Sequence, residues 1–109
     1  MSNKFYPPKK INIFGNVYNF EMVESFPDDR DGDCSWYEKK IRYLNPDSII
    51  DISDEAKTAM LKEVISHEVW HAILYELGLV EYGMDETLIY ALGATMPKIL
   101  KIFRKANLI

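Results

Sequence analysis

The feature that most constrains this chain is a long helical pattern, from about Ser53 to Leu77, that contains both of its histidines. Ser53 or Asp54 can cap the start of this helix, and Gly78 is a typical left-handed residue at its end. Apolar residues recur at spacings of three and four along two sides of the segment, so we expect a buried central helix. A chain of 109 residues has room for one core. We therefore expect a single domain, residues 1–109, built around this helix.

The two histidines lie one helical turn apart, in the segment His67-Glu68-Val69-Trp70-His71. Both imidazoles are expected to point inward and to converge on one point. Glu68 is rotated by about 100° from His67, which places its carboxylate beside a bound metal rather than on it. This is the H-E-x-x-H pattern of zinc hydrolases, in which the glutamate takes a proton from a zinc-activated water. The alternative is a core helix with two ordinary imidazoles, but unpaired imidazoles in a core are costly.

A catalytic zinc site of this kind needs a third protein ligand, and no further histidine is available. The candidates are acidic residues downstream of the motif, namely Glu76, Glu81, Asp85 and Glu86. Glu76 points about 140° away from His71 on the same helix, and Asp85 has the character of a helix cap. Glu86 begins an apolar stripe of the following helix that can face the histidines. We prefer Glu86 as the third ligand, and Asp85 and Glu81 stay open as alternatives.

The N-terminal half has a different pattern, rich in β-branched and aromatic residues that are broken by turns. INIFGNVYNFEMV indicates a hairpin turning at Gly15-Asn16, and CSWYEKKIRYLN indicates a second hairpin turning near Glu38-Lys39. After the motif helix, a loop from Gly78 to Gly83 should lead to a second helix that begins near Asp85 and returns beside the end of the first as an antiparallel hairpin. Pro97 should then interrupt it or open a short C-terminal helix. The chain is therefore predicted to be an α+β protein with a small antiparallel or mixed sheet packed on the motif helix.

Composition limits the class of partner. The net charge of −4 has the wrong sign for a nucleic-acid binder. The single cysteine cannot form an internal disulfide, the start MSNKFYPPKK is not a secretory signal, and no apolar run is long enough to span a bilayer. We therefore expect a cytoplasmic protein without a nucleic-acid or membrane partner. The basic, amphipathic end PKILKIFRKANLI is expected to be a packed last helix rather than a helix on a partner or membrane surface.

The order of the segments resembles a known family. Two hairpins, then LKEVISHEVWHAILYELGL, then DETLIYALGATM resemble the compact H-E-x-x-H metallopeptidases often encoded by phages and prophages, which are related to the ImmA/IrrE-like family. The resemblance covers about residues 11–100 and implies a minimal zincin fold, with a twisted sheet over the motif helix. It matches His67 and His71 to the zinc ligands, Glu68 to the base and Glu86 to the third ligand. The chain lacks the usual Glu-Ala-Asn run after that ligand and is shorter than the larger members, so the substrate stays open.

These observations predict a zinc-dependent endopeptidase that hydrolyses a peptide bond in a cytoplasmic protein. The resemblance suggests a repressor or another host or phage regulator as substrate, held antiparallel along an exposed sheet edge. Our candidate edge is Cys34, Ser35, Trp36 and Tyr37, which follows a flexible acidic loop. The alternative is a catalytically idle relative that keeps zinc for structure and acts by binding a host or phage protein. Glu68 favours the enzyme, because a purely structural zinc site does not need it.

Overall fold

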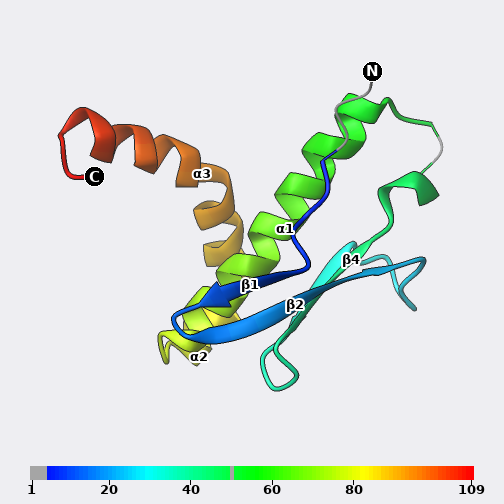
Figure 1. Cartoon of the computed structure of the whole chain (residues 1–109), viewed down its shortest axis with the longest axis horizontal. Helices are drawn as coiled ribbons and strands as arrows, with labels where there is room; N and C mark the ends of the chain where they lie inside the picture. Colours follow the sequence, from blue (N-terminus) through cyan, green and yellow to red (C-terminus); the bar gives the residue numbers. More distant parts are fainter. Residues whose placement is uncertain (1–4, 50) are drawn as a thin grey trace.

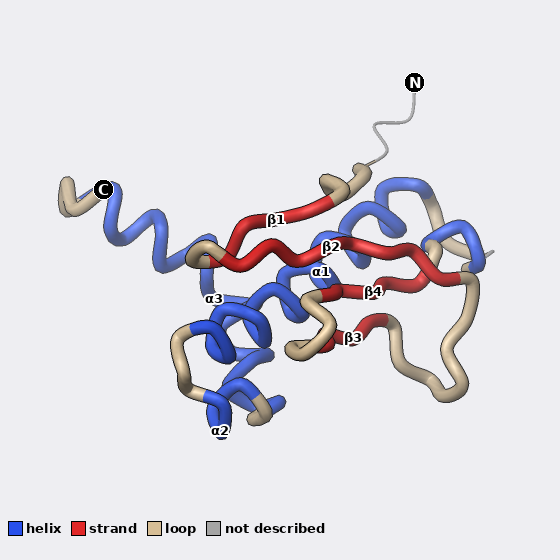
Figure 2. Tube along the Cα trace, turned by 60° about the horizontal axis from the view of Figure 1, so that its bottom comes forward, coloured by secondary structure: helices blue, strands red, loops and turns tan. Residues whose placement is uncertain are grey.

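The computed structural model of the chain describes residues 5–49 and 51–109. A four-stranded mixed sheet forms one layer, and a long helix crosses one face of it (Figures 1 and 2). The elements are β1 (Lys10–Ile13), β2 (Asn16–Val23), β3 (Gly32–Ser35), β4 (Lys40–Leu44), a 3₁₀ turn (Pro46–Ser48), α1 (Asp54–Glu76), α2 (Val80–Gly83) and α3 (Glu86–Lys105). The predicted α+β class, with a small mixed sheet on the motif helix, is confirmed.

The sheet has the strand order β1-β2-β4-β3. The two predicted hairpins both form, since β1 pairs antiparallel with β2 and β3 pairs antiparallel with β4. The hairpins join through β2 and β4, which run parallel. This arrangement leaves β3 at one edge of the sheet, next to α1.

The turn of the first hairpin lies one residue earlier than predicted. Phe14 and Gly15 have φ values of 52° and 91°, so these two residues form the turn, while Asn16 already pairs with Ile13. The side chain of Asn12 accepts a hydrogen bond of 2.7 Å from the Gly15 amide, which stabilises this tight turn. The prediction that Gly15 and Asn16 form the turn was therefore wrong. The hydrogen bond from the Gly15 amide to Asn12, which precedes the turn, favours a turn at Phe14 and Gly15 instead.

Helix α1 begins and ends as predicted. The Ser53 hydroxyl accepts a hydrogen bond of 3.1 Å from the Ala56 amide, and Gly78 adopts a φ of 79° just after the helix. Its Ala72 is buried against the sheet residues Tyr18 and Ile41, which are both fully buried. This apolar contact fixes the face of α1 that meets the sheet, and with it the direction of the neighbouring side chains.

The region after α1 differs from the prediction in two respects. The short helix α2 lies where we expected a loop. Helix α3 then runs without a break through Pro97, so the predicted separate C-terminal helix is wrong. Proline lacks an amide hydrogen and crowds the preceding turn, which bends a helix without necessarily ending it. Figure 1 shows this bend, which carries the second half of α3 away from α1. None of the helices described is long and apolar enough to cross a membrane.

Candidate metal centre

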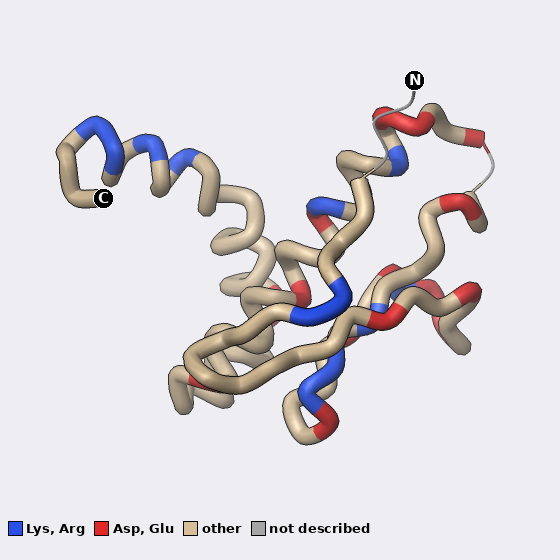
Figure 3. The backbone as a smooth tube through the Cα atoms, viewed as in Figure 1, with Lys and Arg blue, Asp and Glu red and all other residues tan. Residues whose placement is uncertain are grey.

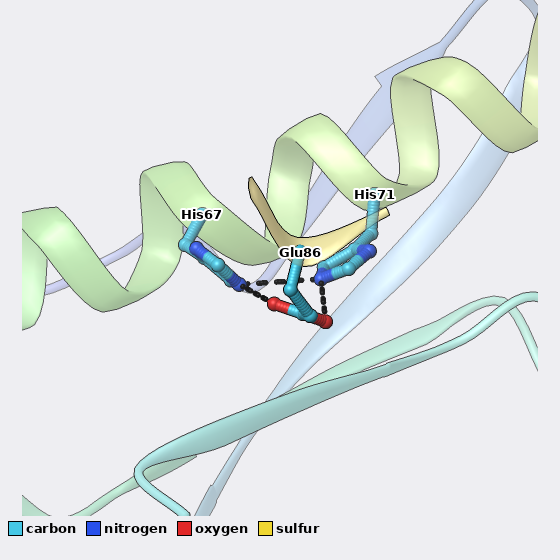
Figure 4. Close-up of side chains that lie close together, drawn as sticks. All are labelled: His67, His71 and Glu86. Atoms are coloured by element: carbon cyan, nitrogen blue, oxygen red, sulfur yellow. Dashed lines mark hydrogen bonds and ion pairs between the residues drawn. The ribbon is translucent and has the colours of Figure 1, made fainter. Parts of the chain in front are cut away.

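Three side chains converge between α1 and the start of α3 (Figure 4). The Nε2 atoms of His67 and His71 lie 3.2 Å apart. One carboxylate oxygen of Glu86 lies 2.8 Å from Nε2 of His67, and the other lies 3.1 Å from Nε2 of His71. The three residues predicted as ligands are therefore brought together, although Glu86 comes from a different helix.

The donor set fits a zinc ion. Two imidazole nitrogens that bind one tetrahedral zinc at about 2.05 Å are separated by about 3.3 Å, close to the distance between the two histidines here. The carboxylate of Glu86 supplies the third donor, and its side chain is 60% exposed, so the group is open to solvent on that side. Two histidines and one carboxylate with an accessible fourth position are typical of catalytic zinc sites.

The other acidic candidates have different roles. Asp85 caps α3, because its side chain accepts a hydrogen bond of 3.2 Å from the Leu88 amide. Glu81 is an exposed residue of α2 and is not part of the cluster. Glu76 is not part of the cluster, because its carboxylate is bound by Lys39 and Trp36.

Glu76 closes a part-buried hydrogen-bond network at the C-terminal end of α1. Its side chain is only 4% exposed and accepts hydrogen bonds from Lys39 at 2.6 Å, Trp36 at 3.1 Å and Tyr18 at 3.3 Å. Burial by itself raises the pKa of Glu76, but the hydrogen bonds and the charge of Lys39 outweigh it and lower that pKa overall. The network ties the β3–β4 turn to the end of α1. Trp36 also stacks on Tyr75, whose ring lies beside His71.

The orientation of His71 is fixed by a backbone group. The Nδ1 atom of His71 lies 2.5 Å from the carbonyl oxygen of Gly83, at the end of α2. In neutral His71 this contact requires a proton on Nδ1, which leaves the lone pair of Nε2 directed at the cluster. A Cβ atom at Gly83 would meet the Tyr75 ring at 2.7 Å, so this close approach depends on glycine. Gly83 could not be identified from the sequence, because any residue can supply a backbone carbonyl as acceptor.

Glu68 lies beside the cluster and beneath β3. It is 6% exposed, and one of its oxygens is 3.9 Å from Nε2 of His71. Burial, followed by the charges of Glu86 and Asp33, raises the pKa of Glu68 to about 8. Gly32 permits this burial, because a Cβ atom there would meet Val64 at 2.8 Å and the Glu68 side chain at 3.3 Å. Glu68 is thus a buried carboxyl group that is not itself one of the three donors.

The cluster opens into a groove with a volume of about 710 Å³. One wall is α1, and the opposite wall includes Gly32, Asp33 and Cys34 of β3. The groove is long enough in both directions from the histidines to include Met60 at one end and Tyr75 at the other. It can therefore admit an extended chain rather than only a small ion.

The predicted sheet edge is correct for its first two residues only. Cys34 and Ser35 belong to β3, but the strand ends there, and Trp36 and Tyr37 lie in the turn before β4. The Leu44 amide donates to the Asp31 carbonyl, and the register then directs the backbone groups of Asp33 and Ser35 toward β4. The backbone groups of Gly32 and Cys34 therefore face the open edge.

Cys34 is half-buried against the core, as expected for a small apolar residue. Burial, followed by the charge of Glu68, raises the pKa of its thiol to about 12. Cys34 is not part of the group formed by His67, His71 and Glu86 among the residues that the structure describes.

The chain was also compared with known proteins. No family model, no curated protein and no solved structure matches it.

Proposed function

We propose that the protein is a zinc-dependent endopeptidase that acts on a cytoplasmic protein, and that it belongs with the compact H-E-x-x-H metallopeptidases it resembles. The observation that carries this proposal is the convergence of His67, His71 and Glu86 beside a buried carboxyl group, Glu68. A structural zinc site is usually closed by four protein ligands. Here three donors leave one position accessible, and the chain retains a buried acid that a structural site does not require.

The chain's own residues divide the work of hydrolysis. His67, His71 and Glu86 would hold the metal, which supplies a water of lowered pKa and polarises the substrate carbonyl. Glu68 would accept the proton of that water and pass it to the leaving amine. Its pKa of about 8 in the metal-free protein reflects burial, and a nearby dication lowers that pKa again, so that the accepting carboxylate is favoured. The Gly83 carbonyl keeps His71 in the tautomer with its proton on Nδ1, so that the lone pair of Nε2 is free for the metal.

The substrate would lie along β3. Strand addition uses backbone groups that have no partner in the sheet, and those of Gly32 and Cys34 face the open edge of β3 beside the groove. An extended segment paired with these two residues would pass over Glu68 and the donor cluster. This geometry favours a flexible segment of a protein, such as a linker or tail of a host or phage regulator, over a folded surface.

The test compares two variants of the zinc-loaded protein on a mixture of unstructured peptides, read by mass spectrometry. Glu68→Gln should keep its zinc and its fold while cleavage falls by about 10²–10⁴-fold, as expected for the loss of a general base. His71→Ala should lose both the zinc and the cleavage. If the wild-type protein binds zinc and peptides but Glu68→Gln behaves identically in every assay, the peptidase proposal is wrong. The idle zinc-containing binding protein then replaces it.

A further inference from the structure

The second half of α3 has a charge opposite to that of the rest of the molecule. Residues 98–109 contain four basic residues, Lys98, Lys101, Arg104 and Lys105, and no acidic residue. The whole chain has a net charge of −4, so the +4 of this segment leaves −8 for the remainder. Figure 3 shows these basic residues gathered on the arm that extends beyond the bend of α3. The segment is thus a cationic arm on an anionic body.

The arm is also amphipathic. Phe103 is two residues from both Lys101 and Lys105, which places it about 160° around the helix from each. Ile99 lies on the same side as Phe103, about 40° away, and Ile102 lies between this side and Lys98. The arm therefore has an apolar side and a basic side, a pattern that requires an environment with both characters.

The apolar side of the arm is largely uncovered. Ile102 is 63% exposed and Phe103 is 42% exposed, and Leu108 and Ile109 at the end are about two-thirds exposed. The expectation that this segment packs as a last helix is therefore wrong for residues 101–109, which are all exposed. The helix nevertheless ends in a regular C-terminal cap. Asn107 adopts a φ of 58°, and the Leu108 amide donates a hydrogen bond of 2.9 Å to the Phe103 carbonyl.

We propose that residues 98–109 form an interfacial anchor that lies flat on an anionic membrane surface. Its apolar side would enter the headgroup region, and its four cations would face the anionic lipids. A nucleic acid would satisfy the cations but leave Ile102 and Phe103 exposed, whereas pairing of two copies through the apolar side would bring two cationic arms together. An anionic membrane surface satisfies both sides of the arm.

The acidic body does not oppose this placement. The molecule extends 41 × 35 × 25 Å, and the bend carries the arm away from α1 (Figure 1). At physiological salt, charges separated by more than about 8 Å are largely screened. The finding that no described helix can span a bilayer concerns insertion across it, not adsorption on its surface. The proposal is independent of the proposed peptidase activity.

The experiment measures co-sedimentation of the full chain with vesicles of phosphatidylcholine, with and without phosphatidylserine, at physiological and at high salt. We expect binding to the anionic vesicles at physiological salt, weaker binding at high salt, and little binding to the neutral vesicles. The double variant Lys101→Gln with Lys105→Gln should weaken partitioning onto the vesicles by about tenfold or more, because each cation near an anionic surface strengthens the electrostatic attraction to it. Phe103→Ser should also weaken it, because the apolar side is required. Circular dichroism verifies that each variant is folded.

The matched control removes two cations from the other end of the chain. Lys9→Gln with Lys10→Gln changes the net charge equally, and both residues are exposed, yet binding should stay near the wild-type level. Equal losses in the two double variants would mean that net charge alone matters, which overturns the proposal. It is also overturned if anionic vesicles do not bind the wild-type chain. In that case, dimerisation abolished by Phe103→Ser, or binding to nucleic acid, would identify what covers the arm instead.

Discussion

Replacing Glu68 with glutamine should make the metal-free protein more stable at neutral pH but not at acidic pH. Glu68 is 6% exposed, and burial is the main cause that raises its pKa to about 8 from an ordinary value of 4.5. Glutamine has nearly the same size but does not ionise. The substitution therefore removes the cost of keeping a proton on this buried carboxyl group, while the packing beneath β3 is retained.

The sign and the size follow from proton linkage. Because the folded-state pKa of Glu68 is raised, its contribution to stability is fully present below pH 4.5 and is lost as the pH rises through about 8. Each pH unit in this window is worth about 1.4 kcal/mol. At pH 7 the wild-type protein has therefore lost about 3 kcal/mol relative to Glu68→Gln, whereas at pH 4 the two should be nearly equal.

Urea unfolding in the presence of a chelator, followed by circular dichroism from pH 4 to pH 9, measures this difference. Glu76→Gln is the control, because Glu76 is also a buried carboxyl group, but its pKa is lowered by its partners despite burial. A lowered pKa contributes stability at neutral pH that is lost on acidification, so Glu76→Gln should destabilise the protein at pH 7. The reasoning is refuted if wild type and Glu68→Gln have parallel stability profiles between pH 4 and pH 8.

Three further predictions concern the site. Zinc at about a hundred times its dissociation constant should stabilise the fold by about 2.7 kcal/mol and raise Tm by roughly 10–20 °C in a thermal scan. This increase should be smaller in Glu86→Gln. It should be unchanged in Asp85→Asn, because asparagine can still cap the start of α3. Gly83→Ala should lower zinc affinity by about 10–100-fold in a competition titration, because the new Cβ atom displaces the carbonyl that orients the imidazole. Cys34→Pro should weaken peptide binding in a fluorescence assay more than Cys34→Ala does, because the amide of residue 34 faces the open edge of β3. Ser35→Pro should instead disturb the sheet, because the amide of residue 35 faces β4. A folded Ser35→Pro variant that loses more binding than Cys34→Pro would contradict this assignment of the register.

The parts of the structure that the sequence predicted correctly depend on local signals. The ends of α1 follow from Ser53 as a cap and from Gly78, which acts within one turn of the helix. The convergence of His67 and His71 follows from helix geometry alone, since two residues four apart lie on one face. Glu86 was predictable because a helix hairpin returns the start of the second helix to the end of the first. None of these inferences required knowledge of a distant contact.

The errors concern one turn, one proline and one exposed helix segment. The first turn moved to Phe14-Gly15 because Asn12 binds the Gly15 amide. Pro97 did not end α3, because a helix that is already anchored by its first turns can bend around a proline. The exposed arm beyond the bend could not be distinguished from a packed helix by periodicity. An amphipathic pattern shows that an apolar side must be covered, but it does not show by what.

Two glycines mark the difference between an H-E-x-x-H motif and an assembled site. At Gly32, β3 approaches α1 so closely that a Cβ atom would overlap Val64, and this approach buries Glu68. At Gly83, α2 approaches from the other side, and its carbonyl binds His71. The motif specifies the donors and the acid, but these close approaches set the pKa of the acid and the tautomer of the histidine. A chain with the same motif and alanine at both positions would keep the donor residues yet lose the close approaches that bury Glu68 and orient His71.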